Sequence, residues 1–270
     1  LNVTADTLRA QVTARTRAIV VTHLFGLPCD MAPIRKLASE HGLAVIEDAA
    51  QAFGASWRGT PIGARGDYVS FSFHANKNVT SIEGGALVLA DAAEAPRCER
   101  LRLQGVRRYG EDGIEVDEPG GKFNLTDVAA RVGLGQLARA DEFTARRRAL
   151  ARRYLALWDP ALPWQLPVAD FEQSNWHMFQ CVLDLDRLTL TRADFIAAMR
   201  AEEIGIGVHY PAVHLFKLYR GLGWRDGQFP HAEHAGRGIV TLPLFPAMVD
   251  ADVDRVVAAA TRILRGASRR

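Results

Sequence analysis

Residues 17–48 read RAIVVTHLFGLPCDMAPIRKLASEHGLAVIED, and this stretch decides the expected fold. Residues 17–22 form a short apolar run typical of a strand. Residues 31–41 place apolar side chains at helical spacing, with Gly42 as a C-cap, and residues 43–46 form a second apolar strand. Strand, helix and strand at this spacing predict a βαβ unit, and therefore a parallel sheet with helices on its faces.

The same alternation continues outward from this unit, and it predicts an α/β protein. The further predicted elements are strands at 68–73 and 86–90, a helix ending near 104, a surface loop at 109–121, long helical patterning at 125–158 bent near the glycines at 133 and 135, a strand at 178–185, a helix at 191–204, a strand at 206–209, and helices at 231–239 and 251–265. The proline-containing segment 160–175 predicts a crossing between domains. We expect a large domain over residues 1–158 and a smaller C-terminal α/β domain over residues 159–270.

The composition excludes several classes of function. Hydrophobic residues make up 48% of the 270 residues and the formal net charge is +2, which gives no reason to expect nucleic acid or an anionic membrane as a partner. Three widely spaced cysteines predict neither a disulfide framework nor a zinc site, and they fit a reducing compartment. The sequence has no apolar run of membrane-spanning length and no signal-peptide pattern, so we expect a soluble cytoplasmic protein.

A cluster of arginines is the one marked concentration of charge. We expect these arginines to form a solvated helix face, and nucleic-acid binding is the less favoured alternative. They are Arg146, Arg147, Arg148, Arg152 and Arg153.

Polar residues follow three of the predicted strands. Ligands of open α/β sheets bind outside the carboxyl ends of the strands, so these residues are candidates for a site. An acid, an amide, a hydroxyl and an amine suit a cofactor that needs a counter-charge, a phosphate anchor and a covalent amine partner. Each has a structural alternative, because an Asp after a strand often caps a helix and a loop lysine is usually solvated. The residues are His23, Asp48, Gln51, Ser72, His74 and Lys77.

Two longer motifs favour the functional interpretation. Residues 45–54 read VIEDAAQAFG and residues 70–85 read SFSFHANKNVTSIEGG, and together they resemble the DegT/DnrJ/EryC1/StrS aminotransferases. The resemblance extends from about residue 17 to residue 262. It continues through HLFGLPCD at 23–30, KFNLTD at 122–127, WHMF at 176–179, GVHYPAVH at 207–214 and LPLFP at 242–246. HANKN and KFNLTD are similar to the corresponding segments of enzymes that aminate UDP-4-keto pentoses and related 4-keto sugars.

The resemblance implies a pyridoxal-phosphate (PLP) enzyme of fold type I, without a metal. Lys77 matches the lysine that bonds covalently to PLP and then shuttles the proton, and Asp48 matches the aspartate that pairs with the pyridine nitrogen. Gln51 matches a contact to the ring or its hydroxyl, and Ser72 matches the hydroxyl that binds the phosphate. Asn124 matches an asparagine that the neighbouring subunit supplies to the phosphate, which implies a homodimer with shared active sites.

The resemblance also implies the substrates. His209, Tyr210 and His214 match the segment that lines the sugar-nucleotide side. The expected reaction transfers an amino group from L-glutamate, which leaves as 2-oxoglutarate, to a nucleotide-linked keto sugar. Such a reaction serves polysaccharide, lipopolysaccharide or amino-sugar biosynthesis.

Two alternatives and three departures accompany this interpretation. A sugar dehydratase of the same family typically has histidine at the lysine position, so Lys77 argues against that function. A non-catalytic regulator that binds PLP or sugar nucleotide is the other alternative.

The departures from the family pattern are as follows. Ile82 and Asn76 differ from residues common in the family. The family's large domain normally begins well upstream of Leu1, so we expect the N-terminal part of that domain to be missing from this chain.

Overall fold

The computed structural model describes residues 1–65 and 68–269, and the chain folds into two compact units. The N-terminal unit contains residues 2–141 and also residues 172–174. Those three residues belong to it because Gln173 accepts hydrogen bonds from the backbone N–H groups of Ser56 (3.0 Å) and Arg58 (3.2 Å). The C-terminal unit contains residues 142–171 and 175 onward. No helix in the described part of the chain is long and apolar enough to cross a membrane.

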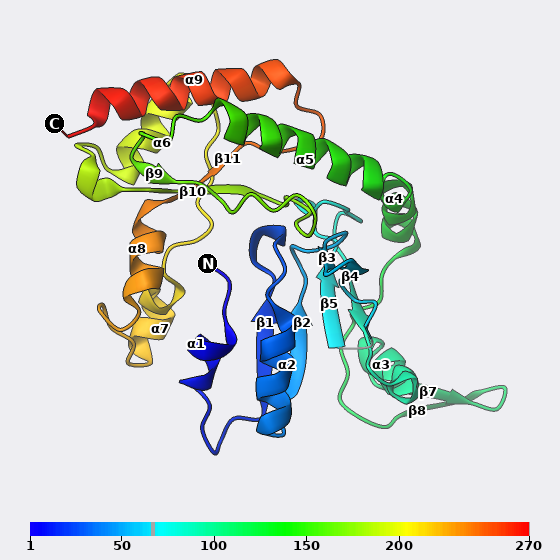
Figure 1. Cartoon of the computed structure of the whole chain (residues 1–270). Helices are drawn as coiled ribbons and strands as arrows, with labels where there is room; N and C mark the ends of the chain where they lie inside the picture. The colour runs from blue at the N-terminus through cyan, green and yellow to red at the C-terminus, as the bar shows by residue number, and fades with distance from the viewer. Residues whose placement is uncertain (66–67, 270) are drawn as a thin grey trace. The chain divides into compact units, whose positions relative to one another are not determined.

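A four-stranded sheet in the order β1-β2-β5-β6 forms the centre of the N-terminal unit. Figure 1 labels three of its strands, β1, β2 and β5. β1, β2 and β5 pair in parallel and β6 is antiparallel to β5. The predicted α/β fold with a mostly parallel sheet is therefore confirmed. The strands are β1 (Ala18–Thr22), β2 (Ala44–Asp48), β5 (Tyr68–Ser72) and β6 (Gly85–Val88).

The helix α2 (Met31–Glu40) makes the crossover from β1 to β2, as predicted. Its apolar face, which includes the fully buried Ile34 and Leu37, packs on Val21 of β1 and on Trp57. Burying one such aliphatic side chain contributes about 1.5–3 kcal/mol, so this face holds the helix against the sheet. Gly42 has φ +62°, a conformation that ends the helix at little cost for glycine.

The remaining elements of this unit include two departures from the sequence predictions. They are α1 (Ala5–Arg9), η1 (Leu24–Gly26), β3 (Ser56–Trp57), β4 (Thr60–Pro61), η2 (Ala92–Glu94), α3 (Ala95–Arg102), β7 (Val106–Tyr109), β8 (Gly113–Val116) and α4 (Asp127–Leu137). The predicted loop at 109–121 is partly the β7–β8 hairpin, whose mostly exposed side chains leave no buried face to mark it in the sequence. The long helix breaks after Leu137 rather than at Gly133, where a methyl group would lie 3.3 Å from Ser81 Cβ, so the glycine serves close packing.

An antiparallel sheet in the order β11-β10-β9 forms the centre of the C-terminal unit. β10 is buried along its whole length. The predicted strand at 206–209 is a single bridge from Gly207 to Thr241, beyond which His209 contacts Thr241 through its ring. The elements are α5 (Ala140–Leu157), β9 (Trp164–Gln165), β10 (Phe179–Leu183), η3 (Leu185–Arg187), α6 (Arg192–Ala201), η4 (Val213–Leu215), α7 (Lys217–Gly221), α8 (Pro230–Gly238), β11 (Ile239–Leu242) and α9 (Asp250–Ala267).

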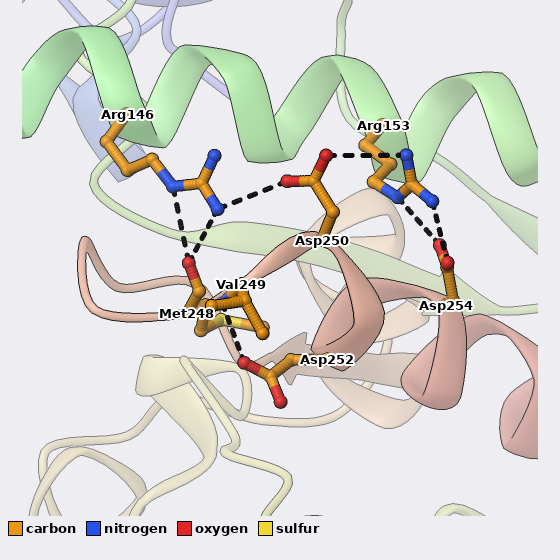
Figure 2. Close-up of polar contacts among 7 residues, drawn as sticks. All are labelled: Arg146, Arg153, Met248, Val249, Asp250, Asp252 and Asp254. Atoms are coloured by element: carbon orange, nitrogen blue, oxygen red, sulfur yellow. Dashed lines mark hydrogen bonds and ion pairs between the residues drawn. The ribbon is translucent and has the colours of Figure 1, made fainter.

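Three of the clustered arginines of α5 hold the C-terminal unit together, and the expectation of a solvated helix face is wrong for these three, Arg146, Arg147 and Arg153, whereas Arg152 is exposed as expected. Figure 2 shows Arg153 paired with both oxygens of Asp254 on α9, at 2.7 and 2.6 Å. Arg146 donates to the carbonyl of Met248 and to Asp250 at the start of α9 (Figure 2). Paired arginines of this kind fasten one helix to another rather than presenting free charge to a polyanion.

Arg147 lies between these two and is buried. Its Nη1 lies within hydrogen-bonding distance of three backbone carbonyls, those of Trp176 (3.3 Å), His177 (3.0 Å) and Leu244 (2.8 Å). Burial lowers the pKa of Arg147 to about 10, so the guanidinium stays charged at neutral pH. A buried cation held by carbonyl dipoles thus joins α5 to two segments distant in sequence.

We expect Arg147→Leu to lower the free energy of unfolding by about 3 kcal/mol, because three buried carbonyls lose a charged donor. Arg200→Leu on the exposed side of α6 is the matched control and should change stability by less than about 0.5 kcal/mol. Guanidinium chloride unfolding followed by tryptophan fluorescence measures both. Equal losses in the two variants would contradict the structural role of Arg147.

Candidate active site

The parallel sheet brings four of the predicted residues of the N-terminal unit to one edge. Asp48 ends β2 and Ser72 ends β5, and the parallel ladder places the carboxyl ends of these two strands together. Gln51 and Lys77 lie in the loops that follow the same two strands. The edge therefore carries a carboxylate, a hydroxyl, an amide and an amine on neighbouring segments of backbone.

The loop after β2 is held in a defined conformation around Asp48. Asp48 Oδ1 accepts the N–H of Ala50 at 3.0 Å, and the carbonyl of Asp48 accepts the N–H of His23 at 3.0 Å. Gln51 Oε1 accepts the N–H of Phe25 at 2.6 Å. Since the oxygen of the amide is engaged by Phe25, the orientation of the Gln51 side chain is set by the loop after β1. Phe25 itself has φ +61°, a conformation that is uncommon for a residue with a side chain.

Lys77 is half-buried in a tight loop after β5. The backbone N–H of Lys77 donates to the carbonyl of His74 at 2.9 Å, and the backbone N–H of His74 donates to Ser72 Oγ at 3.3 Å. Burial lowers the pKa of Lys77, and the negative charge of Asp48 opposes that effect. A larger fraction of the amine is therefore neutral near physiological pH than for an exposed lysine, which suits a nucleophile or a base.

The Glu-Gly-Gly motif at 83–85 is required by close packing against this loop. Gly84 has φ +156°, and a side chain there would collide with Ser81 Oγ and approach Leu125 Cδ1 to 2.8 Å. Gly85 pairs with Ser72 across the strands, and its Cβ would lie 2.7 Å from the carbonyl oxygen of Phe71. The two glycines let β6 approach the strand that carries Ser72.

Asn124 lies at a different part of the N-terminal unit. It lines an open hollow of about 390 Å³ with Glu83, Gly84 and Gly85, and its Oδ1 accepts a hydrogen bond from Lys122 Nζ at 2.6 Å. Asn124 is thus close to the Glu-Gly-Gly motif, but it hydrogen-bonds to Lys122 rather than to Asp48, Ser72 or Lys77.

The three residues expected on the substrate side lie in the C-terminal unit. His209 Nδ1 is 2.8 Å from Thr241 Oγ1, and its ring meets the ring of Tyr210 edge to face at 5.1 Å. Tyr210 is exposed. His214 Nε2 lies 3.0 Å from Glu233 Oε1, and Glu233 also accepts backbone N–H groups at 227 and 229, so His214 helps to fix that turn.

A buried network behind the sheet edge was not anticipated. His23 and Glu47 are nearly inaccessible and lie 2.7 Å apart, and Arg35 of α2 donates to the same carboxylate at 2.6 Å. The only sequence signal was an acidic residue, Glu47, directly before Asp48 in an otherwise apolar strand. Within the described part of the chain, no group of three or more His, Cys, Asp or Glu could hold a metal ion.

We expect the pKa of Lys77 to lie below the ordinary lysine value, and we expect Asp48→Asn to lower it further. Asp48 supplies the attractive charge that favours the protonated amine, so its removal leaves burial unopposed. The pH dependence of acylation of Lys77, read by peptide mass spectrometry, measures this. Asp112→Asn in the β7–β8 turn is the control. A rise in the pKa of Lys77 in Asp48→Asn would contradict the assignment.

Comparison with known proteins identifies the family. The model of the DegT/DnrJ/EryC1/StrS aminotransferase family matches residues 1–261. The chain is 37% identical to the spore coat polysaccharide biosynthesis protein SpsC of Bacillus subtilis, over 99% of this chain and 72% of the relative.

Two solved structures show the same fold at more than 30% identity. DesV of S. venezuelae, determined in complex with a ketimine intermediate, is 33% identical with a TM-score of 0.89, over 97% of this chain and 69% of DesV. DesI, determined in the presence of its TDP-sugar product, is 31% identical with a TM-score of 0.86, over 98% of this chain and 67% of DesI. The chain therefore belongs to the DegT/DnrJ/EryC1/StrS aminotransferase family, a family of PLP-dependent sugar aminotransferases.

Proposed function

We propose that the protein transfers an amino group from L-glutamate to a nucleotide-linked keto sugar. The observation that carries this proposal is the half-buried Lys77, whose lowered pKa and electrostatic coupling to Asp48 match what a PLP-binding amine requires. The TDP-sugar product of DesI and the polysaccharide role of SpsC support a nucleotide sugar destined for a surface polysaccharide. The three cysteines are unpaired, which supports a reducing compartment such as the cytoplasm.

The residues at the sheet edge fit PLP in the chemistry of their side chains. When bound, PLP supplies a carbonyl carbon that accepts an amine and a ring that takes up electron density as a C–H bond breaks. Asp48 would keep the pyridine nitrogen protonated, and Gln51 would contact the ring hydroxyl through its amide. Ser72 Oγ would donate to the phosphate, since an oxygen that accepts the N–H of His74 still carries its own proton.

Lys77 would hold the cofactor covalently until the amine of the donor displaces it, and its freed amine would then move protons. Its Nζ would take the proton from the donor carbon that bears the amino group and return it to the cofactor side, first as a base and then as an acid. The neutral amine favoured by burial is the form that begins this transfer. We further propose that His209, Tyr210 and His214 contribute to binding of the sugar nucleotide, with the exposed Tyr210 as the contacting side chain.

We propose that the active form is a homodimer in which Asn124 reaches the phosphate of the partner's cofactor. The exposed apolar side chains around Asn124 support an interface: Phe123 is 80% exposed and Val128 73% exposed. The helix α4, which follows directly, has no buried residue. An apolar surface of this kind is typical of a protein–protein contact.

We expect the purified protein to show a visible absorption band with PLP that depends on Lys77. L-glutamate should bleach the band and 2-oxoglutarate should restore it, and Lys77→Ala should abolish it. Lys36→Ala on the exposed side of α2 should behave as the parent. With ¹⁵N-glutamate and a panel of UDP-, dTDP- and GDP-linked keto sugars, mass spectrometry should find the label in an amino sugar.

The other outcomes separate the alternatives. Loss of a sugar hydroxyl without incorporation of ¹⁵N would indicate a dehydratase. Binding of PLP and sugar nucleotide without turnover would indicate a regulator. No Lys77-dependent band would contradict the proposed function.

We expect mixed dimers of Lys77→Ala and Asn124→Ala to recover activity, because one of their two sites then has an intact lysine and an intact asparagine. If both residues act within one subunit, every site of the mixed dimer has one defect. Turnover after the two variants are unfolded and refolded together, compared with each variant refolded alone, measures this. Recovery of no activity would contradict the sharing of Asn124 between subunits.

A further inference from the structure

The hydrogen bonds of His23 determine which ring nitrogen carries its proton. The N–H of Cys29 donates to His23 Nδ1 at 3.1 Å, so Nδ1 is an acceptor. His23 Nε2 lies 2.7 Å from Glu47 Oε2 and therefore donates to the carboxylate. His23 is fully buried, so both of its partners are groups of the protein. The imidazole is thus a fixed bridge between the loop after β1 and strand β2.

Glu47 is held from two sides. His23 occupies one carboxylate oxygen and Arg35 Nη2 donates to the other at 2.6 Å. Burial alone would raise the pKa of Glu47, but the hydrogen bond from His23 and the charge and hydrogen bond of Arg35 outweigh it and lower the pKa. Glu47 is therefore an ionised carboxylate inside the unit, and its side chain points to the opposite face of β2 from that of Asp48, its neighbour in the strand.

The same bridge connects to the candidate site through the backbone. The N–H of His23 donates to the carbonyl of Asp48 at 3.0 Å. Two residues later, the N–H of Phe25 donates to Gln51 Oε1 at 2.6 Å. The loop fastened by His23 thus holds Asp48 by its backbone and Gln51 by its side chain.

We propose that His23, through its hydrogen bond to Glu47, is a positioning residue that places Asp48 and Gln51 against the cofactor ring. This inference rests on the proposed function, in which those two side chains contact PLP. His23 itself takes no part in proton transfer, because both of its nitrogens are engaged away from the site. Loosening the bridge should alter how firmly Asp48 holds the proton on the ring nitrogen.

Two substitutions separate the halves of the bridge. In His23→Gln the amide nitrogen lies at the position of Nε2 and can still donate to Glu47, whereas in His23→Asn the shorter amide reaches only the position of Nδ1. Leu37→Ala, in the apolar cluster that also contains Cys29 but outside the network, is the control for general loss of stability. All are compared with the parent by PLP affinity and by the pH midpoint at which the visible band of the bound cofactor changes.

We expect His23→Asn to bind PLP about tenfold more weakly and to shift the pH midpoint, as is typical when a supporting residue behind a site is lost. His23→Gln should stay within about twofold of the parent, and Leu37→Ala should lower the melting temperature without moving the midpoint. Equal effects of His23→Asn and His23→Gln, or an unchanged midpoint in a folded His23→Asn, would overturn the inference. A parent without a Lys77-dependent band would instead contradict the proposed function.

A measurement on the parent keeps the test open if His23→Asn does not fold. Nitrogen NMR of the ¹⁵N-histidine-labelled protein reports the ring tautomer of His23 directly, with His23→Gln to assign the signal. We expect the neutral ring to carry its proton on Nε2 and none on Nδ1. An Nε2 without a proton would have nothing to donate to Glu47 and would overturn the inference.

Discussion

Parallel pairing of β1, β2 and β5 is the constraint on which the N-terminal unit and its candidate site depend. It carries three carboxyl-terminal strand ends to one edge and so joins residues that are far apart in the chain. It also fixes which of two adjacent acids serves which purpose. A slip of one residue in β2 would exchange the faces of Glu47 and Asp48, so that Asp48 would turn away from the site and Glu47 would turn to the face that Asp48 now occupies. The register of β2 therefore determines which carboxylate faces the site.

Much of the fold could be predicted from the sequence because burial leaves a pattern. The strands that flank α2 are apolar and α2 has an apolar face, so the βαβ unit could be predicted from the sequence. The β7–β8 hairpin was not, since its side chains are mostly exposed and no core selects them. The single bridge at Gly207 was predicted as a full strand because a short apolar run does not reveal how many of its residues find a partner.

The candidate site was predictable in a different way. Strand ends pointed to Asp48, Ser72 and Lys77, but their roles came from a resemblance to a family and not from periodicity. The bridge from His23 to Glu47 could not be predicted, because nothing in a sequence pairs a histidine after one strand with an acid inside the next. The prediction of a solvated face for Arg146 and Arg153 failed for the same reason, because their partners on α9 lie about a hundred positions further along the chain.

The return of residues 172–174 to the N-terminal unit has a consequence for how such proteins are assembled. Gln173 completes the backbone hydrogen bonding of Ser56 and Arg58, although the chain has entered the other unit well before it. Neither unit is therefore one uninterrupted stretch of sequence. A single cut between residues 141 and 142 could not yield the whole N-terminal unit, because Gln173 would leave with the other fragment and Ser56 and Arg58 would lose their acceptor.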